Sequence, residues 1–235
     1  MTASPQACLD EALHIVFDAV LFDMDGLLLD SERVLMHAWT AAAAEEGLLI
    51  RPEIYAGVIG RAAQESHRLF VEMFGGLATY QRLRERVDGL IGRDREGQVV
   101  FPLKDGVVEL LRELRARGVP CAVASSSGAA EIRHRLDAVG VLSQFTAVAG
   151  GNEVAQGKPD PAVYRLAAQR LGIAATACLA FEDSENGARA ALAAGAQLVV
   201  VPDLRRPAED IIARSLHVFD SLHDARAHVS RWFPR

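Results

Sequence analysis

Five short apolar runs that alternate with longer amphipathic segments constrain the fold of this chain more than any other feature. The runs cover residues 19–22, 119–124, 145–149, 177–181 and 198–201. Most are apolar nearly throughout, as expected of parallel strands covered on both faces. Helices are expected between them, near residues 105–117, 128–139, 161–171 and 185–194. This repeated order predicts an α/β fold with a doubly wound, mostly parallel, Rossmann-like sheet.

Residues 31–99 interrupt this rhythm. They contain helical stretches near 33–46, 62–74 and 78–91 but no convincing strand. Because this segment directly follows the first predicted strand, we expect an inserted α-helical cap domain that closes over the carboxyl edge of the sheet. The catalytic core then comprises residues 1–30 and 100–235.

Bulk properties exclude several classes of protein. The net charge of −6 argues against a general affinity for nucleic acid or anionic membrane. No apolar run approaches the roughly 18 residues of a membrane span, and the N-terminus does not resemble a signal peptide. Three cysteines without a C-x-x-C pair suit a reducing compartment. We therefore expect a cytoplasmic protein, monomeric by default, with no nucleic-acid or membrane partner.

Polar residues follow the first two apolar runs, where open α/β sheets bind their ligands. Asp23, Asp25 and Gly26 follow the first run, and Ser125 and Ser126 follow the second. Taken alone, a solvated turn explains the acids, and simple helix capping explains the serines equally well. The functional interpretation is a cation site with a nucleophilic carboxylate, beside hydroxyl and N–H groups that cradle a phosphate.

Two further strand ends carry Lys158, within Gly-Lys-Pro-Asp-Pro, and the pair Glu182 and Asp183. Each is a weak signal alone, since surface lysines and helix-capping acids are common. Together, the four strand ends deliver two acidic pairs, a hydroxyl cluster and a lysine to one edge of the predicted sheet. Mg²⁺ commonly takes one or two carboxylates plus a substrate phosphate. The combined set therefore predicts magnesium-dependent chemistry on a phosphate group.

Four motifs in this order resemble those of the haloacid dehalogenase-like hydrolases, over nearly the whole chain from about residue 17 onward. They are Asp23-x-Asp25-Gly26, Ser125, Lys158 and Glu182-Asp183. The chain is most similar to the subgroup with a helical cap after the first strand, which contains sugar-phosphate phosphatases and β-phosphoglucomutases. The segment Asp30-Ser31-Glu32 also resembles the phosphatase side of that subgroup.

The resemblance implies a role for each core motif. Asp23 is expected to be the nucleophile that forms an aspartyl-phosphate. Asp25 is expected to act first as general acid to the leaving group and then as general base to water. Ser125 is expected to hydrogen-bond a phosphoryl oxygen, and Lys158 to orient Asp23 and neutralise charge.

The resemblance also implies a metal site and substrate contacts. Mg²⁺ is expected on the side chains of Asp23 and Asp183 and the Asp25 carbonyl, with Glu182 as an outer or alternative ligand. Three residues are expected to contact the substrate: Ser126, Gly26 and Arg61. Arg61 matches the cap region where relatives bind substrate, although a solvent-facing helix arginine explains it equally well.

Other activities stay open at this point. A phosphomutase uses the same aspartyl-phosphate, but β-phosphoglucomutases carry a histidine a few residues after the first motif, where this chain has Leu35, with His37 offset. A dehalogenase needs neither the metal nor the second aspartate, and signalling receiver domains are shorter and lack a cap. The expected function is therefore a phosphatase acting on a small phosphorylated metabolite, with its particular substrate open.

Overall fold

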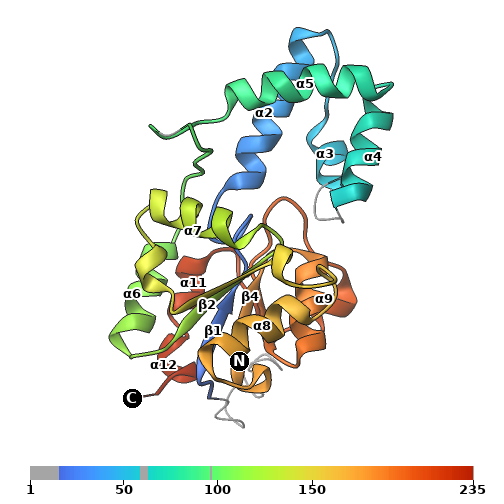
Figure 1. The fold of residues 1–235 in the computed structure, drawn as a ribbon. Helices are drawn as coiled ribbons and strands as arrows, with labels where there is room; N and C mark the ends of the chain where they lie inside the picture. The colour runs from blue at the N-terminus through green and yellow to red at the C-terminus, as the bar shows by residue number, and fades with distance from the viewer. Residues whose placement is uncertain (1–15, 59–62, 96, 235) are drawn as a thin grey trace, which may run out of the picture.

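The computed structural model describes residues 16–58, 63–95 and 97–234 (Figure 1). Its centre is a six-stranded sheet in the order β3-β2-β1-β4-β5-β6. Every neighbouring pair of strands is parallel. The strands are β1 (Ala19–Phe22), β2 (Cys121–Ser125), β3 (Ala147–Gly150), β4 (Cys178–Glu182), β5 (Gln197–Val200) and β6 (His217–Val218). The predicted doubly wound, parallel α/β sheet is confirmed.

The strand order creates a crevice beside β1. The chain runs outward from β1 through β2 to β3, and then returns to place β4 on the other side of β1. The connections after β1 and β4 therefore leave in different directions, and such a switch point opens a ligand site at the carboxyl ends of the strands.

Both faces of the sheet are covered by helices, which explains why the strands are apolar throughout. Phe22 and Phe181 stack on one face with ring centroids 5.2 Å apart, among α6 (Val107–Ala116), α7 (Ala129–Ala138), α11 (Leu222–Arg226) and α12 (Val229–Trp232). The opposite face presents small residues such as Ala19 and Ala180 to α8 (Ala162–Leu171), α9 (Glu185–Ala194) and α10 (Glu209–Ile212). Alternate residues of each strand thus serve different cores.

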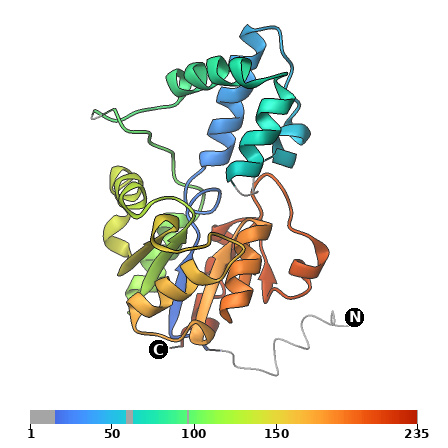
Figure 2. The same cartoon turned by 45° about the vertical axis from the view of Figure 1, so that its right-hand side comes forward.

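Four helices stand above the carboxyl end of the sheet: α2 (Ser31–Glu45), α3 (Pro52–Val58), α4 (Ala63–Met73) and α5 (Leu77–Leu90) (Figures 1 and 2). An aromatic cluster joins α2, α4 and α5, since Trp39 stacks on Phe70, Phe74 and Tyr80 at centroid distances of 5.0, 5.4 and 5.7 Å. The inserted helical cap is thus present, while its boundaries at residues 31 and 99 stay a prediction.

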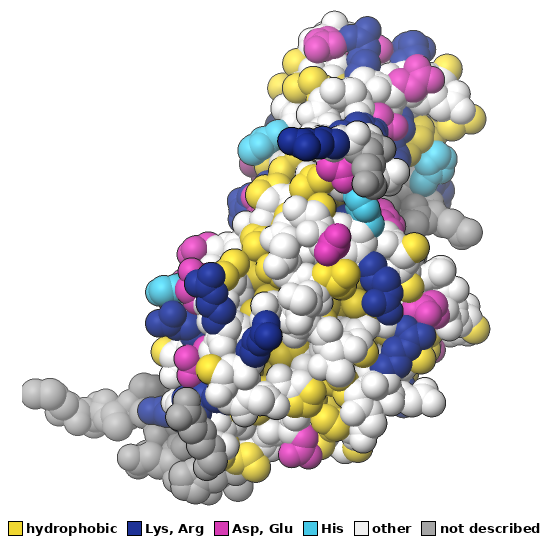
Figure 3. Space-filling model, turned by 60° about the vertical axis from the view of Figure 1, so that its left-hand side comes forward, with side chains coloured by type: hydrophobic (Ala, Val, Ile, Leu, Met, Phe, Trp, Pro, Cys, Tyr) yellow, Lys and Arg dark blue, Asp and Glu magenta, His cyan; other side chains and the backbone are white. Residues whose placement is uncertain are grey.

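Several short elements were not predicted, among them β6 with two residues, α3 with seven, and the helices α10, α11 and α12 that follow β5. Within the described ranges, no helix is long and apolar enough to cross a membrane. On the face shown in Figure 3, basic and acidic side chains are interspersed rather than gathered into a patch of one sign. The expectation that the chain binds no nucleic acid stays a prediction.

Candidate active site

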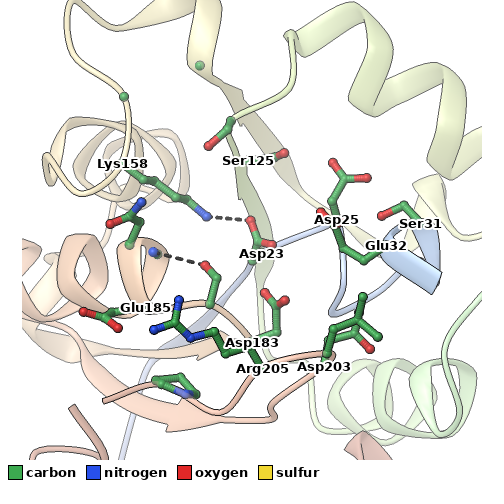
Figure 4. Close-up of a pocket in the computed structure, with 18 of the residues that line it drawn as sticks. Asp23, Asp25, Ser31, Glu32, Ser125, Lys158, Asp183, Glu185, Asp203 and Arg205 are labelled. Carbon is green, nitrogen blue, oxygen red and sulfur yellow. Dashed lines mark hydrogen bonds and ion pairs between the residues drawn. The ribbon is translucent and has the colours of Figure 1, made fainter. Parts of the chain in front are cut away.

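The ends of β1, β2 and β4 bring four of the predicted site residues together. Asp23 follows β1, Ser125 ends β2, and Glu182 and Asp183 lie at the end of β4. All four are buried, with exposed fractions from 0% to 8%. Asp23, Ser125 and Asp183 line a cavity of about 780 Å³ together with Lys158 (Figure 4).

Lys158 lies between two carboxylates. Its Nζ is 2.5 Å from Oδ1 of Asp23 (Figure 4). It is also 2.6 Å from Oε1 of Glu182, and the side chain is only 6% exposed. It also lies 4.9 Å from the ring centroid of Tyr164. Burial alone opposes the charge, but the charges of Asp23 and Glu182 outweigh it and raise the pKa of Lys158. The ammonium group therefore stays charged beside Asp23.

Glu182 is saturated with hydrogen bonds. Its Oε1 accepts from Lys158 and from Oη of Tyr164 at 2.7 Å. Its Oε2 accepts from the N–H groups of Asp183 and Ser184 at 3.1 Å and from Oγ of Ser184 at 3.0 Å. Helix α9 packs so closely that a Cβ on Gly187 would lie 1.7 Å from Oε1 of Glu182. Glu182 is thereby fixed as the support of Lys158.

Asp183 differs sharply from its neighbour. Its Oδ1 is buried and has no hydrogen-bond partner within the described part of the chain. Burial and then the charges of Glu182 and Asp23 raise the pKa of Asp183 well above its usual value. Burial is also the main cause that raises the pKa of Asp23 to about 7, although Lys158 opposes it. This region therefore holds more negative charge than Lys158 alone balances.

These residues fit a divalent cation. Oxygen atoms from Asp23, Glu182 and Asp183 lie within 4.8 Å of one another. Carboxylates are ligands that Mg²⁺ prefers, and an unpaired buried oxygen is the kind of atom that a bound cation satisfies. Since both oxygens of Glu182 are already engaged, Asp23 and Asp183 are the better placed of the three.

Asp25 is held from helix α7, by contacts that the sequence did not reveal. Its Oδ1 accepts a hydrogen bond from Nη1 of Arg135 at 2.9 Å, and its Oδ2 accepts one from Oγ of Ser127 at 3.1 Å. The side chain is 26% exposed and lines the cavity. In the sequence, Arg135 is indistinguishable from other helix arginines such as Arg133, so no local signal identifies it.

The remaining predicted positions lie at the same edge. Oγ of Ser125 accepts from the N–H of Ser127 at 3.1 Å, and Ser126 is exposed and lines the cavity. Gly26 has a φ of +83°, and a Cβ there would lie 2.3 Å from Oδ2 of Asp183. This position requires glycine for both reasons. Arg61 lies outside the described residues.

The start of α2 forms the cap side of the cavity. Ser31, Glu32 and Leu35 line it, whereas His37 is exposed. Burial, followed by the charges of Asp25 and Asp203, raises the pKa of Glu32 to about 7.

Asp203 was also missed by the sequence analysis, and its side chain is only 2% exposed. It follows β5, so the rule of collecting polar residues after apolar runs would have found it.

Comparison with known proteins adds independent information. Residues 17–195 match the family model of the haloacid dehalogenase-like hydrolases. The chain is 34% identical over 214 residues to a probable pseudouridine-5'-phosphatase of Drosophila melanogaster, covering 87% of this chain and 89% of the relative. It is 32% identical over 185 residues to hexitol phosphatase A of Escherichia coli, covering 77% and 81%.

A solved structure shares the fold. A haloacid dehalogenase family hydrolase from Deinococcus radiodurans, crystallised with bound phosphate and sodium, superimposes with a TM-score of 0.76. The identity is 30%, and the match covers 91% of this chain and 95% of that one. The shared architecture thus extends over both the sheet and the helical cap.

Proposed function

The chain belongs to the haloacid dehalogenase-like hydrolases, and on that premise we propose that it is a Mg²⁺-dependent phosphatase that hydrolyses a small phosphorylated metabolite through an aspartyl-phosphate. As an enzyme it is a hydrolase of phosphate esters, like its relatives that are named phosphatases. One observation carries the finer proposal: Lys158 pairs with Asp23, while a buried oxygen of the neighbouring Asp183 has no hydrogen-bond partner among the described residues.

Asp23 is the proposed nucleophile. Lys158 holds its Oδ1, which leaves Oδ2 to attack phosphorus. A bond forms between this oxygen and phosphorus as the ester P–O bond breaks, and Asp25 gives its proton to the leaving alkoxide. In the second half, Asp25 takes a proton from water as that water attacks phosphorus. Inorganic phosphate leaves, and Asp23 returns to its carboxylate form.

Charge at the phosphoryl group is offset by groups around Asp23. Lys158 supplies one fixed positive charge, and Ser125 and the N–H groups near Ser126 supply hydrogen-bonding groups. Asp23, Asp183 and the Asp25 carbonyl would hold Mg²⁺, which supplies Lewis acidity toward a phosphoryl oxygen.

The cap side of the cavity supports a sugar phosphate or a similar phosphomonoester as the substrate. The two relatives compared above are named for pseudouridine 5'-phosphate and hexitol phosphate, which both carry polyol-type hydroxyls. Ser31 and Glu32 offer polar atoms on this side of the cavity. Leu35 is apolar and lines the cavity where mutases of this family carry a histidine, which favours hydrolysis over phosphoryl return.

The test is phosphate release from a panel of phosphorylated metabolites, with and without Mg²⁺. The Asp23→Asn variant should lose release, whereas Asp18→Asn, an exposed change at the opposite end of β1, should retain it. The panel includes β-glucose 1-phosphate, with formation of glucose 6-phosphate followed separately. Isomerisation without phosphate release would replace the phosphatase by a phosphomutase. Absence of turnover from folded, Mg²⁺-loaded protein would contradict the proposal.

A further inference from the structure

Asp203 is a buried carboxylate whose two oxygens differ: one contacts two cations, and the other has no partner in the part of the chain that the structure describes. Its Oδ1 is 3.2 Å from Nη2 of Arg33 and also contacts Nζ of Lys104. Its Oδ2 is buried and has no hydrogen-bond partner among the residues that the structure describes. Leaving a buried acceptor without a hydrogen bond is unfavourable, because the group loses water and gains no partner in exchange. This arrangement therefore calls for a donor that the described residues do not supply.

The free oxygen faces the proposed metal site. A Cβ on Gly26 would lie 2.3 Å from Oδ2 of Asp183 and 3.5 Å from Oδ2 of Asp203. The two carboxylates thus flank the same glycine. Figure 4 shows Asp203 on the Asp183 side of the cavity, opposite Lys158. The charge of Asp203 also adds to burial and to the nearer acids in raising the pKa of Asp183.

Two cations fix the orientation of Asp203. Arg33 lies in the first turn of α2, and Lys104 lies in the segment that returns from the cap to α6. Both also approach Oδ1 of Asp30, at 3.4 and 3.8 Å. Because they contact only Oδ1 of Asp203, they leave Oδ2 oriented toward another partner.

We propose that Asp203 is a positioning residue of the metal site, whose Oδ2 accepts a hydrogen bond from a water molecule bound to Mg²⁺. This inference rests on the proposed function, since it requires the ion on Asp23 and Asp183. Mg²⁺ gives up its waters reluctantly and usually keeps several of them when bound to protein. Carboxylates that accept hydrogen bonds from the ligands of a metal hold those ligands in place, and their loss typically weakens affinity 10–100-fold.

The test measures Mg²⁺ binding directly, by titration calorimetry on the full chain after treatment with EDTA. The Asp203→Asn variant keeps the shape of the side chain but removes its charge, and its Kd for Mg²⁺ should rise by about 10–100-fold. The matched control is Asp210→Asn, which removes an exposed acid of α10 that pairs with Arg189; its Kd should not change. Asp183→Asn should lose binding altogether. Unfolding temperatures without metal establish that each variant is folded.

A second variant tests the same inference in case Asp203→Asn does not fold. Lys104→Gln leaves the carboxylate in place but releases one of its two anchors, and should weaken Mg²⁺ binding several-fold. If the wild type binds Mg²⁺ and both variants bind it equally well, Asp203 has no role at the metal and this inference is overturned. If the wild type itself binds no Mg²⁺, the proposed metal-dependent function fails along with it.

Discussion

Arg135 donates a hydrogen bond to Oδ1 of Asp25 across 2.9 Å and so ties helix α7 to the turn after β1. The guanidinium is itself fixed, because it pairs with Glu131 one helical turn earlier and lies 5.0 Å from the ring centroid of Phe101. Phe101 belongs to the segment that returns from the cap. The orientation of the proposed general acid is therefore set by α7 and this segment as well as by its own turn.

Replacing Arg135 tests this relationship. Arg135→Leu removes the donor to Asp25, so kcat should fall by about tenfold or more, since well-placed acid–base catalysis is worth roughly 10²–10⁴. KM should change little, because Arg135 is engaged with protein groups. Steady-state kinetics on the best substrate provides the measurement. Arg135→Lys should recover part of kcat, and Arg133→Leu, an exposed change on the same helix, should leave it intact. Equal kcat in all of these variants would show that α7 does not orient Asp25.

Loss of Lys158 should affect both stability and rate. Lys158→Met leaves Asp23 and Glu182 as buried carboxylates without their counter-ion, and breaking a buried pair in this way costs about 3–5 kcal/mol. The same change should lower kcat by about 10²–10³, the usual cost of removing a group that stabilises transition-state charge. Urea unfolding and kinetics measure the two effects.

Tyr164→Phe serves as the control for Lys158→Met. It removes the hydrogen bond to Glu182 and the longer one, at 3.5 Å, from Lys158, and should cost about 1–3 kcal/mol. Its kcat should fall far less than that of Lys158→Met, because Tyr164 does not contact Asp23. A Lys158→Met enzyme with normal kcat would exclude Lys158 from the mechanism.

Two helical glycines should respond to alanine with opposite signs. In α9, a Cβ on Gly187 would lie 1.7 Å from Oε1 of Glu182, so Gly187→Ala must displace the support of Lys158. We expect a loss of about 1–3 kcal/mol from overpacking, together with lower activity. In α5, a Cβ on Gly89 would meet no described atom within 4 Å. Gly89→Ala should therefore stabilise by about 0.5–1 kcal/mol. Thermal unfolding of both variants measures these changes in stability. A Gly187→Ala variant as stable as the wild type would contradict the tight packing of α9 on Glu182.

The sheet was predictable because its strands are buried on both faces and remain apolar along their length. The strand β6 was not predicted, because its two residues, His217 and Val218, are too few to form a periodic pattern. The positions of Asp23 and Ser125 followed from the strand-end rule, since parallel strands deliver their carboxyl ends to one edge.

The different hydrogen-bonding environments of the site residues were not predictable in the same way. The residue types do not distinguish Glu182 from Asp183, which are adjacent and both acidic, and only the family resemblance assigned the metal to Asp183. Their difference depends on Tyr164 and Ser184, which saturate Glu182, while no described group donates to Oδ1 of Asp183. The pairing of Arg135 with Asp25 likewise depends on how α7 packs.

Low pH should weaken the contacts that hold the end of β3, within a defined pH range. Glu153 in the 3-10 helix Gly151–Glu153 holds Arg170 of α8 through both oxygens, at 2.8 and 2.9 Å, and also accepts from the N–H of Gly150 at 2.9 Å. The hydrogen bond from Arg170, followed by that from Gly150, lowers the pKa of Glu153 from 4.5 to about 2. The folded state thus favours the ionised form. Its stabilisation is fully present above about pH 4.5 and is lost as the pH falls toward 2.

Glu153→Gln should therefore be less stable than the wild type at pH 7, by about 0.5–1 kcal/mol for a pair this exposed to solvent. The difference should shrink below pH 4.5 and vanish near pH 2. Urea unfolding at a series of pH values measures it, with Glu72→Gln, an exposed change on α4, as the control for loss of a carboxylate. Loosening the end of β3 should also affect the active site, because Gly151 packs closely against Ser126. A Cβ on Gly151 would lie 2.4 Å from the carbonyl oxygen of Ser126. A difference that stays constant between pH 7 and pH 3 would instead show that packing, rather than the ionised Glu153, holds the end of β3 beneath Ser126.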